Sequence, residues 1–308
     1  MMQGFPPKAE GQVTLANWRS PPFSRWSFQH VREIVPSVDI PNAPDAVWRL
    51  PSKTSDLSSV TFEHKGRRFD FESFLRETDT DGIVILHRGT VIHESYAHGM
   101  TRHTPHILMS VSKSLLGIIA GMLVDDGVLE LDRPVVDLIP EIENTAFSGA
   151  TIGNLLDMRA GIHFDEDYLA TSGMIIDYRK SHNWNPLEPG DPLSDMRSFF
   201  QRFKQSDGPH GGRFHYVSPN TDLLGWVIER ASNTRYADLV SARLWQPMGA
   251  ERSAYITVDR LGAPRCAGGV CATVIDLARV GQLIVQDGRR DGKAVIPAAW
   301  IDEITEHG

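Results

Sequence analysis

One apolar segment, residues 109–124, constrains the fold of this chain more than any other feature. It reads Met-Ser-Val-Ser-Lys-Ser-Leu-Leu-Gly-Ile-Ile-Ala-Gly-Met-Leu-Val, so apolar residues cover nearly the whole circumference of a helix. Such a helix must be enclosed by other elements on most of its sides. The 308 residues can build the core this requires, as one large domain or two closely packed ones.

Ser110 and Lys113 stand three residues apart at the start of this helix, and their side chains therefore share one face. Serine is a weak nucleophile until a base removes its proton, and burial lowers the pKa of a lysine toward the range where it can act as that base. The four-letter pattern Ser-x-x-Lys is common by chance, but this is the single match in the chain and it opens an apolar helix. We predict that Ser110 is a nucleophile and Lys113 its base, with the Ser110 N–H facing a developing oxyanion.

A second polar cluster follows at 214–222. Tyr216 and Ser218 are two residues apart in a segment that reads as extended, so their side chains point the same way, and Asn220 begins the next helical pattern. A tyrosine beside a cationic amine can relay a proton. Taken alone, a packing tyrosine followed by a helix cap is the simpler interpretation.

The other regular elements are predicted from periodicity. Runs 83–87 and 91–96 predict a β-hairpin, and Gly117 and Gly121 predict close approach of a neighbouring element to the apolar helix. The segment 162–192 reads as loop-rich. Helical patterns occur at 25–34, 151–158, 195–205, 220–232, 272–285 and 297–305.

Three stretches in order, 109–117, 216–226 and 268–281, resemble the class C β-lactamase-related serine hydrolases, and most of all the 6-aminohexanoate-dimer hydrolases. The resemblance implies an α+β fold of the β-lactamase/penicillin-binding-protein type, with an antiparallel sheet flanked by helices and a mainly helical subdomain. It implies that Ser110 is acylated, that Lys113 is its base and that Tyr216 relays the proton. It also implies substrate contacts from Tyr168, Ser218 and Asn220.

The resemblance further divides the chain into an irregular N-terminal arm (1–58), an α/β domain (59–127 and 262–308) and a mainly helical subdomain (128–261). It implies later strands, with a third motif and a second oxyanion donor, that the 308 residues do not contain. The dipeptide His307-Gly308 matches that motif only in part. We therefore expect a fragment with an incomplete sheet and half an oxyanion hole.

Charge and composition exclude several function classes. The net charge of -8 and the pI near 5.8 argue against nucleic acid or a membrane surface as partner. The N-terminus lacks the apolar stretch of a secretory signal, which favours a cytoplasmic location. Cys266 and Cys271 read as small core residues, and no cofactor is expected. His98, His103 and His106 read as solvated loop residues rather than metal ligands.

The predicted substrate is a small linear amide or ester. Carboxylesterase, β-lactamase and D-peptidase activities stay open, because the catalytic motifs set the reaction type and the pocket walls set the substrate. A non-catalytic binding module or an inactive fragment of the fold is the alternative from a different class. An α/β-hydrolase is excluded by the lack of a Gly-x-Ser-x-Gly motif. The oligomeric state is left open, with a homodimer among the options.

Overall fold

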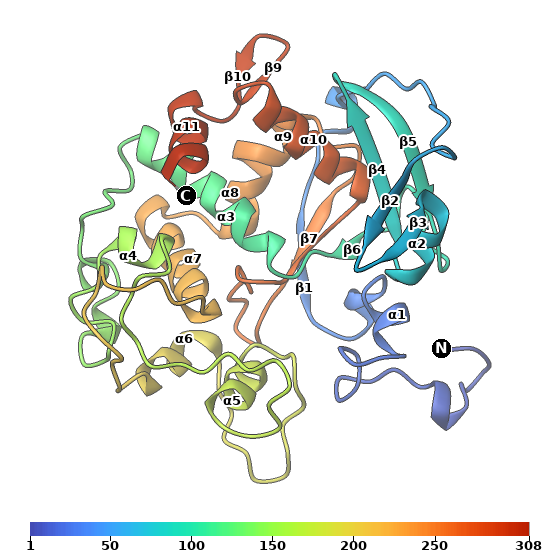
Figure 1. Cartoon of the computed structure of the whole chain (residues 1–308). Coiled ribbons are helices and arrows are strands. Elements are labelled where there is room, and N and C mark those ends of the chain that lie inside the picture. The colour runs from blue at the N-terminus through green and yellow to red at the C-terminus, as the bar shows by residue number, and fades with distance from the viewer. Residues whose placement is uncertain (308) are drawn as a thin grey trace.

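The computed structural model describes residues 1–307, and at its centre is a four-stranded antiparallel sheet in the order β1-β7-β8-β6 (Figure 1). Every residue of β7 and β8 is buried, which accounts for their continuous apolar and small composition. The four strands are β1 (Ser37–Ile40), β6 (His106–Ile107), β7 (Ala254–Thr257) and β8 (Val270–Ala272). Gly308 lies outside the described residues, and with it half of the dipeptide noted above.

The predicted β-hairpin is confirmed. Strands β4 (Gly82–His87) and β5 (Thr90–Tyr96) pair antiparallel, with a register shift between Ile85 and Leu86. Helix α10 (Val274–Val285) lies beside β4 (Figure 1). Two small hairpins were not predicted: β2 (Thr61–His64) with β3 (Arg67–Asp70), and β9 (Arg289–Arg290) with β10 (Lys293–Ala294). Helix α2 (Phe71–Glu77), which directly follows β3, was not predicted either.

The apolar helix is α3 (Val111–Asp125), with Ser110 at its N-cap position. It runs through the middle of the molecule, between the sheet and the other helices (Figure 1). Leu115, Leu116 and Ile119 are each at most 1% exposed, and burying a side chain of this size contributes about 1.5–3 kcal/mol. The all-round apolar pattern is therefore satisfied by packing on most sides.

Helix α11 (Ala298–His307) packs against α3 through Trp300. The Trp300 Nε1–H donates to the carbonyl oxygen of Gly117 at 3.0 Å, and a Cβ on Gly121 would come within 2.1 Å of the indole ring. The predicted close approach is confirmed, although only Gly121 requires the absence of a side chain. A Cβ on Gly117 would meet nothing within 4 Å.

Several helices gather on the side of α3 away from the hairpin (Figure 1). Three of the predicted helices, at 151–158, 195–205 and 220–232, are present here with shifted ends. Thr151 and Asp195 act as N-caps, and the 195–205 segment continues as a 3-10 turn. An additional helix, α5, interrupts the segment predicted to be loop-rich. The helices on this side are α4 (Ile152–Leu156), α5 (Met174–Ser181), α6 (Met196–Phe199) and α7 (Ser218–Ser232). Helix α8 (Tyr236–Val240) packs against β1, and α9 (Gln246–Met248) packs against α10 (Figure 1).

The N-terminal arm contributes a strand, a short helix and buried side chains to the fold. It contributes β1, whose Val38 pairs with Ile256 of β7, and the short helix α1 (Ser24–Ser27), which overlaps only the first three residues of the predicted 25–34 helix. Trp18 is 1% exposed and belongs to a second cluster of buried side chains with Val31 and Tyr255. Strand β1 belongs to the predicted arm and its neighbour β7 to the predicted helical subdomain, yet they pair in one sheet. The division into arm, α/β domain and helical subdomain stays a prediction. Short 3-10 or π turns complete the described chain at 9–11, 31–33, 44–46, 135–137, 140–142, 200–202 and 241–245.

Two further observations concern the chain as a whole. Cys266 and Cys271 are both free and buried, as expected for small core residues. Across residues 1–307, no helix is both long enough and apolar enough to cross a membrane.

Candidate functional site

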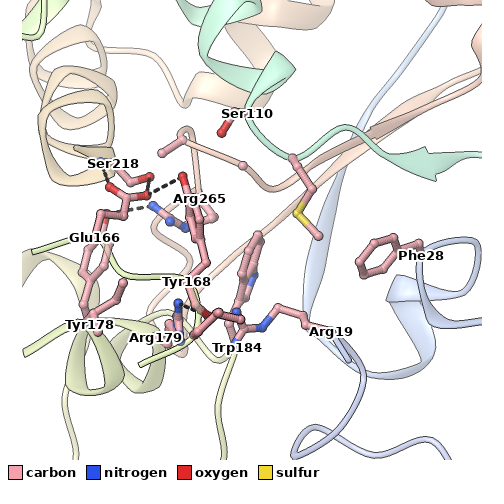
Figure 2. Close-up of a pocket in the computed structure, with 15 residues that line it drawn as sticks. Arg19, Phe28, Ser110, Glu166, Tyr168, Tyr178, Arg179, Trp184, Ser218 and Arg265 are labelled. Carbon is pink, nitrogen blue, oxygen red and sulfur yellow. Dashed lines mark hydrogen bonds between the residues drawn. The ribbon is translucent and has the colours of Figure 1, made fainter. Parts of the chain in front are cut away.

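A cavity of about 500 Å³ opens at the N-terminal end of α3, and Ser110 lies on its wall (Figure 2). Ser218, at the start of α7, and Tyr168, from the 162–173 loop, also line it. The arm adds Arg19 and Phe28. The cavity therefore brings together segments from the arm, α3, the loop before α5 and the start of α7.

Ser110 and Lys113 have the geometry predicted from their spacing. Lys113 Nζ lies 3.0 Å from Ser110 Oγ and 2.7 Å from the carbonyl oxygen of Ala267. Burial lowers the pKa of Lys113 to about 7, assisted by the positive charge of Arg265 and opposed by Glu166. A large fraction of the lysine is consequently neutral near pH 7 and can accept a proton from Ser110.

The backbone before Ser110 is strained. Met109 has a φ of 45°, in the left-handed region that costs a non-glycine residue about 1–3 kcal/mol. Ser110 is exposed at the N-terminus of α3, and the helix itself begins at the next residue, Val111. The Ser110 N–H therefore has no carbonyl partner within the helix and can donate to a substrate oxygen at the mouth of the cavity.

A buried ionic network holds the loop that carries Ala267. Arg265 is paired with Asp222, and both contact the hydroxyl of Tyr178, with Arg265 Nη1 at 2.7 Å. The other oxygen of Asp222 accepts the Ala267 N–H at 2.8 Å. Because Asp222 lies on α7, the network ties the loop to that helix and fixes the carbonyl that faces Lys113.

The next residues of this loop are held just as closely. Ser112 Oγ on α3 accepts the Val270 N–H at 3.1 Å. A Cβ on Gly269 would come within 2.3 Å of Thr257 Oγ1, so the loop passes where only glycine fits. Ser112 therefore has a structural partner, is buried and does not line the cavity.

Glu166 organises the opposite wall of the cavity, a role that was not predicted from the sequence. Its carboxylate accepts both the backbone N–H and the hydroxyl of Ser218, the latter at 2.5 Å. The Tyr168 hydroxyl donates to the same carboxylate at 3.4 Å (Figure 2). Burial, the charge of Glu166 and this hydrogen bond raise the pKa of Tyr168 to about 12, so its phenol stays protonated at neutral pH.

Of the other three predicted site residues, Ser218 lines the cavity, while Tyr216 and Asn220 do not. The ring centroid of Tyr216 lies 5.0 Å from Lys113 Nζ, and its side chain is 40% exposed, beside the amine but not on the cavity wall. Ser218 lines the cavity, as described above. Asn220 is fully buried within α7, does not line the cavity and has no hydrogen-bond partner for its amide among the described residues.

Several wall residues were missed in the sequence. Arg19 and Phe28 come from the arm, and Arg179 and Trp184 from α5 and the turn after it. The arm contains three tryptophans, Trp18, Trp26 and Trp48, and large apolar side chains of this kind are the one sequence signal that the arm docks onto the core. Trp18 is the tryptophan that docks the arm beside the cavity, since its Nε1–H donates to the carbonyl oxygen of Trp184 at 3.0 Å.

Comparisons with known proteins agree with this architecture. The β-lactamase family profile matches residues 71–303. The chain is 33% identical over 304 residues to the 6-aminohexanoate-dimer hydrolase of Paenarthrobacter ureafaciens, covering 99% of this chain and 75% of that protein. A solved structure assigned as a 6-aminohexanoate-dimer hydrolase from Bacillus anthracis superposes with a TM-score of 0.90 at 28% identity, covering 97% of this chain and 78% of that one.

A more distant structure supports the fold alone. The octameric penicillin-binding protein homologue from Pyrococcus abyssi superposes with a TM-score of 0.53 at 20% identity, covering 75% of this chain and 58% of that chain. The predicted α+β fold of the β-lactamase/penicillin-binding-protein type is thus confirmed. The chain belongs to the β-lactamase family, as a serine hydrolase related to the 6-aminohexanoate-dimer hydrolases.

Proposed function

We propose that this protein hydrolyses small linear amides or esters through an acyl-enzyme on Ser110. The observation that carries the proposal is the 3.0 Å contact between Lys113 Nζ and Ser110 Oγ, at a lysine whose pKa is lowered to about 7. A neutral amine at hydrogen-bond distance from a hydroxyl on a cavity wall meets the requirement for an activated nucleophile.

The proposed reaction has two stages. In the first, neutral Lys113 takes the proton of Ser110 while Oγ attacks the substrate carbonyl carbon, and the Ser110 N–H donates to the oxyanion. The lysine proton passes through Tyr216 to the leaving nitrogen or oxygen as the bond to the carbonyl carbon breaks. In the second, water gives a proton to Lys113 while its oxygen adds to the acyl carbonyl carbon. The bond from this carbon to Ser110 Oγ then breaks, Lys113 returns the proton to Oγ, and the acid is released.

An amide is the preferred substrate in this proposal. The relative from Paenarthrobacter is named for an amide, the 6-aminohexanoate dimer. The protonated Tyr168 hydroxyl on the wall is a suitable donor to an amide substrate. Ester hydrolysis by the same acyl-enzyme chemistry is expected as a side activity. The cytoplasmic location and the homodimer stay predictions from the sequence.

The decisive experiment labels the protein with a fluorophosphonate probe. We expect labelling of wild type, none of Ser110→Ala, and normal labelling of Ser114→Ala, because Ser114 is an exposed serine one helical turn further along α3. Equal labelling of wild type and Ser110→Ala would contradict the proposal, and so would a wild type that neither labels nor hydrolyses any ester.

The substrate class follows from kcat/KM on three compounds: the linear 6-aminohexanoate dimer, p-nitrophenyl acetate and a cephalosporin. An amide preference requires measurable Ser110-dependent cleavage of the dimer. Turnover of the acetate alone would make the protein a carboxylesterase, and turnover of the cephalosporin alone would make it a β-lactamase.

A further inference from the structure

We propose that the end of the cavity away from Ser110 binds a carboxylate of the substrate through Arg19 and Arg179. The inference rests on the proposed hydrolase function and narrows its substrates to amides or esters that carry a carboxylate group. Figure 2 shows Ser110 at one end of the drawn residues and the two arginines, beside Trp184, at the other.

Arg19 is fixed in place by the docking of the arm. The preceding residue, Trp18, is 1% exposed and packs edge-on against Trp184 with ring centroids 5.2 Å apart. The guanidinium carbon of Arg19 lies 5.9 Å from the Trp184 ring centroid, and Nη2 donates to the side-chain oxygen of Asn185 at 2.6 Å. Its Nε is buried and has no partner among the described residues. Arg19 thus has one neutral hydrogen-bond partner and an unused donor.

Arg179, on α5, is 6% exposed and likewise contacts only neutral groups. Its Nη2 lies 3.3 Å from the carbonyl oxygens of both Asp167 and Tyr168. Within residues 1–307, neither Arg19 nor Arg179 has a carboxylate within 4.0 Å. The third arginine of the cavity, Arg265, differs because it is paired with Asp222.

The two arginines form an incompletely balanced positive region. Burial and the charges of Arg179 and Arg265 lower the pKa of Arg19 to about 10, and burial is also the largest cause of the lowered pKa of Arg179. The negative charges of Glu166 and Asp167 oppose part of this field at Arg179. The Glu166 oxygens already accept hydrogen bonds from Ser218 and Tyr168, and Asp167 Oδ1 accepts one from the Leu169 N–H. Buried charge without a counterion is costly, and a bound anion would remove that cost.

A carboxylate fits this region better than other groups do. Guanidinium groups donate in a planar fork that matches the two oxygens of a carboxylate. The cavity wall includes Phe28, Leu169 and Ile175, which suit a short methylene chain between the scissile carbonyl and the charged end. An ammonium group at the same place would be repelled by both arginines.

The binding test uses the Ser110→Ala protein, so that it does not depend on catalysis. Calorimetric titration with hexanoate, hexanamide and hexylammonium compares one chain length with three end groups. We expect hexanoate to bind at least about tenfold more tightly than the other two, a difference typical of charge-assisted hydrogen bonds. Adding Arg19→Gln should remove most of this preference, and Arg19→Lys should retain part of it. Arg88→Gln, at the exposed β4–β5 turn, should leave it unchanged.

Equal binding of hexanoate and hexanamide would overturn the proposal. Hexanoate binding that survives both Arg19→Gln and Arg179→Gln would overturn it as well. Failure of the hydrolase function gives a different pair of results. The Ser110→Ala protein would still prefer hexanoate in the binding test, but the wild-type protein would hydrolyse no ester in a Ser110-dependent way.

Turnover then identifies which side of the scissile bond carries the carboxylate. The p-nitrophenyl monoester of adipate is compared with the p-nitrophenyl esters of hexanoate and 6-aminohexanoate. Faster turnover of the adipate ester, lost in Arg19→Gln, places the carboxylate on the acyl side. Faster cleavage of N-hexanoyl-6-aminohexanoate than of its methylamide places it on the leaving-group side. A wild type without a carboxylate preference in either series would count against a role of the two arginines in substrate selection.

Discussion

The carbonyl oxygen of Ala267 lies 2.7 Å from Lys113 Nζ and accepts a hydrogen bond from it. With Ser110 Oγ 3.0 Å from the same nitrogen, the amine is held between a fixed acceptor and the proposed nucleophile. One N–H is directed to Ala267, which leaves the lone pair of the neutral amine available to Ser110. The predictions below test this arrangement and the packing that supports it.

The proposed base predicts the pH dependence of turnover. Only neutral Lys113 can accept the Ser110 proton, so kcat/KM should rise with pH and reach a plateau above a midpoint of about 7. The measurement is kcat/KM for a nitrophenyl ester on both sides of neutrality. In Lys113→Arg, kcat/KM should stay low across this pH range, because a guanidinium group stays protonated and cannot accept the proton. A flat profile in wild type would contradict the assignment of Lys113 as base.

Lys113 should also reduce the stability of the folded protein. Its folded pKa of about 7 lies below the ordinary value of 10.5, so between these two values the unfolded chain binds more protons and stability rises with pH. Lys113→Met should raise the free energy of unfolding at pH 7 by ~1–3 kcal/mol, after the loss of the Ala267 hydrogen bond is counted.

Urea unfolding at pH 7 and above pH 10.5 measures this effect, which should disappear at the higher pH, where both states hold a neutral lysine. Lys53→Met, in an exposed segment, is the matched control and should change stability little. A destabilised Lys113→Met protein at pH 7 would show that burial of the amine carries no such cost.

Tyr216→Phe tests the proposed proton relay. The ring stays beside Lys113, at a centroid distance of 5.0 Å in the wild type, but the hydroxyl is lost. We expect kcat for an amide to fall by about 10²–10⁴ with little change in KM, as for loss of a general acid. Tyr96→Phe, on the hairpin, controls for the substitution itself. An unchanged kcat for the amide would exclude Tyr216 from proton transfer.

Glu166→Gln should shift the pH profile downward. The negative charge of Glu166 raises the pKa of Lys113, so its removal lowers the midpoint of kcat/KM, by up to roughly one unit. It also removes one acceptor from Ser218, since an amide has a single acceptor oxygen. Asp165→Asn, the exposed neighbour, should leave the midpoint in place. A midpoint that rises in Glu166→Gln would contradict this electrostatic role.

Two glycines of α3 should respond in opposite directions to alanine. Gly121→Ala forces a methyl group into the Trp300 ring and should cost about 1–3 kcal/mol of unfolding free energy. Gly117→Ala adds a methyl group in open space within a helix and should stabilise by about 0.5–1 kcal/mol. Denaturant unfolding measures both, and Trp300→Leu should relieve the Gly121→Ala defect. Equal effects at the two sites would contradict the packing of α11 on α3.

Local patterns were sufficient to predict the elements that depend on short-range periodicity. The apolar circumference of 109–124 predicted a buried helix, because side-chain periodicity reports burial within one element. Two β-rich runs separated by Arg88-Gly89-Thr90 predicted the 83–96 hairpin. The spacing of Ser110 and Lys113 predicted their contact for the same reason, since three residues make nearly one helical turn. The resemblance added Tyr216, Ser218 and the fold type.

The tertiary structure alone decided which distant residues complete the cavity. Arg19, Glu166 and Ala267 come from segments more than fifty residues away from Ser110 and from one another, and no local pattern marks an arginine as a cavity residue or a carbonyl as the partner of an amine. The pKa of Lys113 depends on burial and on Arg265 and Glu166, both remote in sequence. The sequence by itself therefore determined the contact between Ser110 and Lys113 and the helix that carries it, while long-range packing decided the charge, shape and expected selectivity of the cavity around them.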